Sequence, residues 1–264
     1  MIDRHASLAT LKPLVTELED SIRARAVETP DVAEHLEREH HRAVVAGRTA
    51  MSLGEWRDGE ITQAAVAWVL GCVFVRFLED NGLIDQALIS GPGGRRAAAL
   101  GHREEHFRAH PSHSDREYLE ACFREVANYR AAAPLYDERH NPLWRLFPTA
   151  DGARLLRETF TAIDPDTGAL VHDFADAELD TRFLGDLYQD LSDAARKRYA
   201  LLRPPSSSSV SSWTGPSIPR SRSSASRTSG SSTPHAGQGI FSSAPSSDSS
   251  PSGKPAKRQQ LQRC

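Results

Sequence analysis

The chain has 264 residues, of which 39% are hydrophobic and 25% are charged, so it is long enough for one or two domains with a buried core. Its composition changes near Leu202: residues 204–264 are about one-third serine and carry seven Lys or Arg against one Asp, whereas residues 1–203 carry 25 basic and 34 acidic side chains. The net charge of about −9 on the first part argues against binding of DNA by that part alone through a broad basic face, although it leaves room for a local basic patch or a partner.

The first segment with helical spacing covers residues 8–22. Its apolar residues recur every three or four positions, as on the buried stripe of an amphipathic helix: Leu8, Leu11, Val15, Leu18 and Ile22. The charged residues around them are expected on the opposite side: Glu17, Glu19, Asp20, Arg23 and Arg25. Thr29 and Pro30 predict a second helix, because Thr is a good N-cap residue and Pro is favoured at the first helical position. That helix should end near Gly47.

A third helix should begin near residues 56–60 and run to Asp80. Between residues 64 and 78 it is apolar nearly all round, which places it at the centre of the fold. Clusters of β-branched residues also permit a strand here. The length of the segment and the Asn81-Gly82 pair favour a helix, because glycine supplies the left-handed residue that closes one.

The remaining segments complete a helical organisation. Residues 91–94 form a Gly/Pro turn, and residues 135–147 form an irregular aromatic segment between prolines. Helices are expected over residues 117–129, 150–163 and 180–202, and no convincing alternation of polar and apolar residues indicates a sheet. The predicted fold class is therefore mainly α. A helical region over residues 1–202 is followed by a disordered, Ser/Pro-rich tail over residues 203–264.

The cysteines and the apolar runs indicate a cytoplasmic protein without a membrane partner. Cys72, Cys122 and Cys264 are too few and too scattered for a disulfide framework. The N-terminus leads into an amphipathic stretch rather than the apolar core of a signal peptide. The longest apolar run, residues 64–75, is shorter than the roughly 20 residues that a membrane span needs.

Four histidines form the most conspicuous candidate metal site. His102, His106, His110 and His113 include pairs at i and i+4 spacing, which places two imidazoles on one helical face, as a zinc site requires. No flanking Cys or carboxylate pattern completes a metal motif, so the segment is interpreted as solvated. His40-His41 lies in a charged run and is interpreted as surface.

No other group has the spacing of a catalytic site. Glu79-Asp80 and Glu104-Glu105 have the chemistry for acid–base catalysis but are more typical of solvated positions. Cys72 and Cys122 lie among apolar residues and are expected in the core. Gly237-Gln238-Gly239 lacks the strand and the lysine of a phosphate-binding loop. We therefore assign no catalytic, cofactor-binding or metal-ligating residue to this chain.

Two segments resemble a known family. Residues 180–192, DTRFLGDLYQDLS, and the helix that continues to residue 202 resemble the stretch just ahead of the methyltransferase domain in the PglX family. Residues 68–83, WVLGCVFVRFLEDNGL, resemble the N-terminal region of the same family. The resemblance covers residues 1 to about 202.

The PglX family comprises adenine-specific DNA methyltransferases of the phage growth limitation system, also called type 2 BREX. The resemblance implies a parent protein that transfers a methyl group from S-adenosylmethionine to adenine N6, with DNA and other defence components as partners. The family continues with a Thr-Pro-led segment and an Asp-Pro-x-Cys-Gly-type loop for S-adenosylmethionine, and a later Asn-Pro-Pro-Tyr-type motif holds the flipped adenine. This sequence has neither motif, so it implies no cofactor in this chain and no activity of the chain alone.

The tail is typical of GC-rich coding DNA translated in the wrong frame. One permitted back-translation of residues 203–215, shifted by two bases, encodes TPEFVVGFVLDRT, the segment that the family leads one to expect. The same frame over residues 217–250 permits DPACGPGH, the type of loop that binds the cofactor. We therefore predict a frameshift near Arg203, with a genuine disordered linker as the alternative.

Two other functions remain open. The first is a non-enzymatic helical interaction module whose basic arm binds nucleic acid loosely through Arg220, Arg222, Arg227, Lys257 and Arg258. The second is a metal-binding regulator that uses the histidines between residues 102 and 113.

Overall fold

The computed structural model describes residues 4–179 and 182–202, and within this part it is mainly α, as predicted. The chain divides into two units, Met1–Ser208 and Ser209–Cys264, and all described residues lie in the first. The prediction for residues 203–264 lies outside the described residues. The elements are α1 Arg4–Glu28, α2 Pro30–Val45, α3 Leu53–Asp80, α4 Arg95–Ala109, α5 Asp115–Ala127, the 3₁₀ turns η1 Ala133–Tyr136 and η2 Pro142–Trp144, α6 Ala150–Thr161 and α7 Arg182–Leu202.

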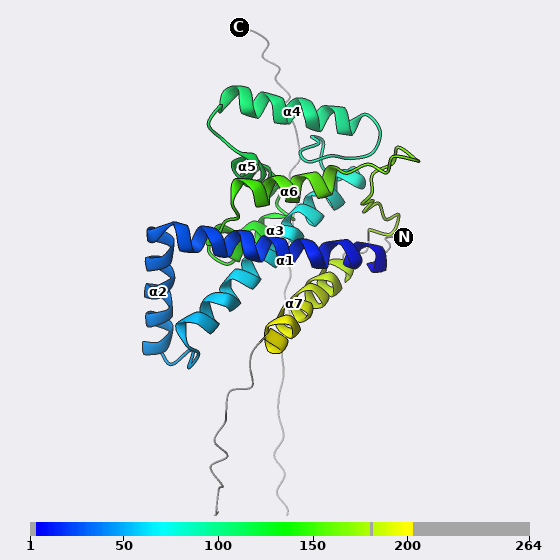
Figure 1. Cartoon of the computed structure of the whole chain (residues 1–264). Helices are drawn as coiled ribbons and strands as arrows, with labels where there is room; N and C mark the ends of the chain where they lie inside the picture. Colours follow the sequence, from blue (N-terminus) through cyan, green and yellow to red (C-terminus); the bar gives the residue numbers. More distant parts are fainter. Residues whose placement is uncertain (1–3, 180–181, 203–264) are drawn as a thin grey trace, which may run out of the picture. The chain divides into compact units, whose positions relative to one another are not determined.

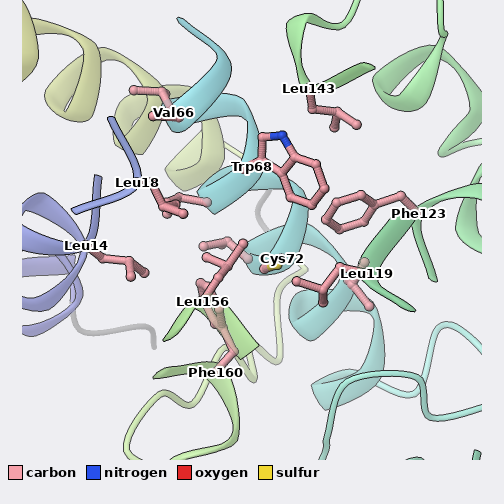
Figure 2. Close-up of a cluster of buried hydrophobic side chains, with 14 of the residues drawn as sticks. Leu14, Leu18, Val66, Trp68, Cys72, Leu119, Phe123, Leu143, Leu156 and Phe160 are labelled. Carbon is pink, nitrogen blue, oxygen red and sulfur yellow. The ribbon is translucent and has the colours of Figure 1, made fainter. Parts of the chain in front are cut away.

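Helix α3 forms the centre of the fold, as its apolar sequence predicts. It packs against α1, α2, α5, α6 and α7 (Figure 1). Figure 2 shows Trp68 and Cys72 of α3 among side chains from three other helices, including Leu18, Phe123 and Leu156. α3 is long and apolar enough to cross a membrane, but 72% of its most apolar stretch is buried inside the described fold. The interpretation of this segment as a buried helix is therefore confirmed.

The ends of α3 follow from local hydrogen bonds. Ser52 and Glu55 form a capping box in which each side chain accepts the other's backbone N–H, so the helix begins earlier than predicted. At the other end Gly82 has φ +64°, and the N–H of Leu83 donates to the carbonyl of Leu78 at 2.8 Å. The Asn81-Gly82 stop is thus confirmed, with glycine in the left-handed conformation that closes the helix.

Helix α1 buries the predicted stripe but differs from the prediction at Glu19. Leu11 and Leu18 are fully buried against the core. Glu19, expected on the solvent side, is also fully buried, where its carboxylate accepts a hydrogen bond from the Thr62 hydroxyl at 2.7 Å. The apolar spacing identifies the stripe of α1, but it does not reveal that a hydroxyl on α3 supplies a partner for an acid beside that stripe.

Helix α4 was not predicted as an element. Its apolar residues do not form a stripe: Ala99 is buried, whereas Leu100 is 54% exposed. Polar contacts attach the helix instead. The Arg95 guanidinium donates to the carbonyl of Ile84 at 2.7 Å, and Arg103 pairs with Asp115 at 3.0 Å. Asp115 also pairs with Arg157 at 3.0 Å, so one buried carboxylate joins α4, α5 and α6.

The irregular aromatic segment between α5 and α6 packs on α3. Its Tyr136 hydroxyl donates to the carbonyl of Gly71 at 2.7 Å, and Trp68 donates in return to the carbonyl of Leu146 at 3.0 Å. Trp144 donates to the carbonyl of Tyr136 at 3.0 Å and so fixes the turn between η1 and η2. The segment is therefore held by its indole and phenol groups rather than by regular structure.

Candidate functional site

Among the described residues, a group of buried and partly buried polar side chains lies at the C-terminal end of α3. It consists of Arg76, Glu79, Asp80 and the C-cap residue Asn81, which we call the α3 network. The sequence predicted a solvated Glu79-Asp80 pair, and this prediction is wrong: the side chains of Glu79 and Asp80 are 0% and 2% exposed. Glu104 and Glu105, the other acidic pair, are exposed as predicted.

Glu79 binds the loop that follows α3. Its carboxylate accepts backbone N–H groups from Leu88, Ile89 and Ser90, at 2.5, 2.6 and 3.1 Å. The Arg76 guanidinium lies 3.3 Å from the same carboxylate. Burial raises the pKa of Glu79 to about 7, while the three N–H groups and Arg76 act in the opposite direction. The residue therefore supplies the acceptors that a buried loop backbone lacks.

Arg76, Asp80 and Asn81 bind the segment that leads into α7. The Arg76 guanidinium donates to the carbonyls of Phe160 and His172, at 2.5 and 3.3 Å, and to both oxygens of Asp80. Asp80 also accepts the N–H of Phe174 at 2.9 Å. The Asn81 side chain donates to the carbonyl of Phe174 and accepts the N–H of Asp176; the donor–acceptor distances are 2.9 and 2.7 Å.

The chemistry of the α3 network is directed at the chain itself. Each acid and amide in it is matched to backbone groups from residues 88–90 or 174–176, and Arg76 pairs with both carboxylates. A general acid or base must instead face a substrate. We therefore interpret the network as a structural clamp that holds two long loops against the end of α3.

The two cysteines lie in the core, as predicted. Cys72 and Cys122 are fully buried free thiols, and burial raises the pKa of both well above the ordinary value. A thiol acts as a nucleophile through its thiolate. Neither position provides that form at neutral pH.

The four histidines are brought together at the turn between α4 and α5. His106 Nε2 lies 3.1 Å from His113 Nδ1, and the rings of His110 and His113 stack with centroids 4.6 Å apart. His102 Nδ1 contacts the Tyr118 hydroxyl at 3.2 Å. Among residues 4–179 and 182–202, no three His, Cys, Asp or Glu side chains are arranged to hold a metal ion. Elsewhere, His41 is exposed, but His40 is half-buried and contacts the carbonyl of Met51 at 2.9 Å.

The histidine group should make the stability of the fold depend on pH. Partial burial, followed by the neighbouring His113, His110 and His102, lowers the pKa of His106, and Glu117 opposes this. As the pH falls, His106 is therefore protonated in the unfolded chain before it is protonated in the folded one. The stability of the fold should decrease as the pH falls below about 6.5, the pKa of histidine in an unfolded chain. We expect thermal unfolding of a His106→Gln variant to change less between pH 7.5 and 5.5 than that of the parent. A His41→Gln variant should behave as the parent does, and an equal change in all three proteins would contradict this role.

Comparison with known proteins identifies a relative. The adenine-specific methyltransferase PglX of Streptomyces coelicolor is 43% identical to this chain over 213 residues. The alignment covers 78% of this chain but 18% of PglX, and it matches an N-terminal region of that protein. The chain thus spans less than a fifth of the length of this relative, and the resemblance stated from residues 68–83 and 180–192 is confirmed. No family model and no solved structure matches the sequence.

Proposed function

We propose that this chain is the N-terminal helical region of an adenine-specific DNA methyltransferase of a phage-defence system, and that it has no methyl-transfer site of its own. One observation carries the proposal: most of the chain matches PglX, yet it matches less than a fifth of that methyltransferase. The name of the relative implies S-adenosylmethionine as methyl donor and DNA as substrate. We assign both to the longer protein, together with a cytoplasmic location and partners among the other defence components.

We further propose that the helical region comprises residues 1–202 and that residues 203–264 are translated out of frame. About a fifth of the chain lies outside the match to PglX, which is close to the share that residues 203–264 make up. The last described element, α7, ends at Leu202. Sequencing the gene from the codon for Tyr199 onward tests this boundary. A frame offset by two bases that encodes DPACGPGH supports it, and an uninterrupted Ser-rich frame with no methyltransferase frame behind it would contradict it.

The proposed role of the helical region is to support the catalytic part of the longer protein. The acids of the α3 network form hydrogen bonds with the chain's own backbone, so they are not free to bind a substrate. Its acidic surplus opposes contact with DNA phosphates over a broad face. A scaffold that packs against a catalytic domain fits both properties.

This proposal predicts that the purified chain does not bind S-adenosylmethionine. Isothermal titration calorimetry should show no saturable heat for the chain, whereas PglX of Streptomyces coelicolor, titrated under the same conditions, should show it. The physical reason is that the chain lacks both the glycine-containing cofactor loop and the motif that holds adenine. Saturable binding by the chain would contradict the assignment of the cofactor to the missing part.

A helical interaction module with a basic arm is the second candidate, and the net charge of about +6 on residues 204–264 favours it. Deleting these residues separates the two functions. If the full chain binds a DNA oligonucleotide with an affinity that falls steeply with salt, and the deletion abolishes binding, the arm is functional. If the deletion does not change DNA binding, residues 204–264 have no such role, and the methyltransferase proposal is kept.

A further inference from the structure

The turn between α2 and α3 exposes an apolar surface. We call residues 44–51, VVAGRTAM, the hairpin tip; they include a single charged side chain, Arg48. Val44, Val45 and Met51 are 44%, 74% and 58% exposed. The preceding helix α2 is rich in charged residues, so the change of composition at the tip is abrupt. A cluster of exposed apolar side chains that is bounded by charged residues is typical of a contact surface.

The hairpin tip is held in place by local contacts. His40 Nε2 lies 2.9 Å from the carbonyl of Met51, and the N–H of Met51 donates to the Thr49 hydroxyl at 3.1 Å. The ring of His40 packs on Trp56, with centroids 5.7 Å apart. Gly47 takes a φ of +66°, which permits the reversal after α2. The exposed apolar groups are therefore presented on an ordered turn, so little ordering entropy is lost when they bind.

Helix α7 runs toward the same end of the fold as the hairpin tip. It packs against α1 and α3, and Phe183 in its first turn contacts Phe77 near the C-terminal end of α3, with ring centroids 5.5 Å apart. From this point α7 continues toward the end of the fold where α2 and α3 meet. In Figure 1 the yellow C-terminal end of α7 lies low in the view, and the turn between α2 and α3 also lies low in it.

We propose that the hairpin tip docks against the methyltransferase domain that follows α7 in the longer protein; this inference rests on the proposed function. The occupant of the surface is inferred from the length of the relative and from the direction of α7. Most of PglX lies beyond the region matched by this chain, and α7 points the continuation of the chain toward the side where the tip is exposed. Removing apolar surface from water is favourable, so burial of the valines and the methionine of the tip would stabilise such a contact.

A chimera tests the docking surface. Residues 1–202 of this chain replace the matching N-terminal region of PglX from Streptomyces coelicolor, and hydrogen exchange of residues 44–51 is compared between the chimera and the present chain. We expect slower exchange at the tip in the chimera. We also expect Val45→Glu to lower the thermal unfolding temperature of the chimera but not that of the present chain. Val27→Glu is the matched control, because Val27 is 68% exposed in the last turn of α1, just before the N-terminal end of α2 and away from the tip.

The outcomes separate the docking surface from the proposed function. If the chimera methylates adenine but its tip exchanges as fast as in the present chain, the docking inference is wrong and the proposed function stands. If the chimera does not methylate adenine although α3 exchanges as slowly as in the present chain, the proposed function fails, and the docking inference fails with it. If the tip of the present chain is protected in a dimer that Val45→Glu dissociates, a second copy is the occupant and the inference is overturned.

Discussion

Replacing Arg76 with methionine should destabilise the fold by about 3–5 kcal/mol, because it leaves buried carboxylates without their cation. The Arg76 side chain is fully buried and lies 3.3 Å from Glu79 and 2.7 Å from Asp80. Methionine fills part of the volume but cannot donate to the carbonyls of Phe160 and His172 that Arg76 now satisfies. The loss therefore affects the end of α3 and the segment that leads into α7.

Urea unfolding followed by circular dichroism measures this effect. Arg38→Met is the matched control: Arg38 pairs with Glu34 one helical turn away, as Arg76 does with Asp80, but the two side chains are 58% and 67% exposed. Its substitution should change stability by less than about 1 kcal/mol. If the two substitutions lower the unfolding midpoint equally, the α3 network is not the clamp that we describe.

Much of the helical framework could be predicted from the sequence. The spacing of Leu11 and Leu18 identified the buried face of α1, and the apolar run through Trp68 and Cys72 identified the central helix. These elements bury side chains that repeat with the period of the helix itself, so the signal is local. The close of α3 at Gly82 was predictable for the same reason, because the left-handed conformation is a property of one residue.

The polar interior could not be predicted, because its partners are distant in the sequence. Glu79 is buried because the N–H groups of residues 88–90 require acceptors, and Asp80 because residue 174 returns to α3 from 94 positions away. No local sequence pattern indicates that a segment so distant in the sequence will contact the end of α3. Helix α4 was missed for a related reason: Arg95 and Arg103 attach it through polar contacts, so it has no apolar stripe to detect.

The sequence predicted the positions of some candidate functional residues but not the contacts of others. The core position of Cys72 and Cys122 followed from their apolar neighbours and is confirmed. The contact between His106 and His113 depends on the turn at the end of α4, which spacing alone does not fix. The family resemblance came from residues 68–83 and 180–192. The first of these segments contains the whole α3 network. The hydrogen bonds of this network with the backbone of two loops explain why polar residues cluster at the end of an apolar helix.

Replacing Gly152 with alanine should destabilise the fold by about 1–3 kcal/mol, although alanine is the better helix former. A Cβ atom at this position would lie 2.2 Å from the Ser21 hydroxyl and 2.8 Å from its Cβ. That hydroxyl cannot move freely, since it accepts the N–H of Thr149 at 3.0 Å and pairs with the Thr149 hydroxyl at 2.8 Å. Thr149 is in turn the N-cap of α6 and accepts the N–H of Gly152. The added methyl group would therefore separate α1 from α6 and disturb the cap.

Gly101→Ala in α4 is the control, because nothing lies within 4 Å of the Cβ position there. It should stabilise the fold by about 0.5–1 kcal/mol, as expected for an unhindered helical glycine. Chemical unfolding of both variants should thus give shifts of opposite sign. Adding Ser21→Ala to Gly152→Ala removes the closest clash, so the double variant should be more stable than the sum of the single changes predicts. Stabilisation by Gly152→Ala alone would show that α1 and α6 lie further apart than the Ser21–Thr149 hydrogen bonds require.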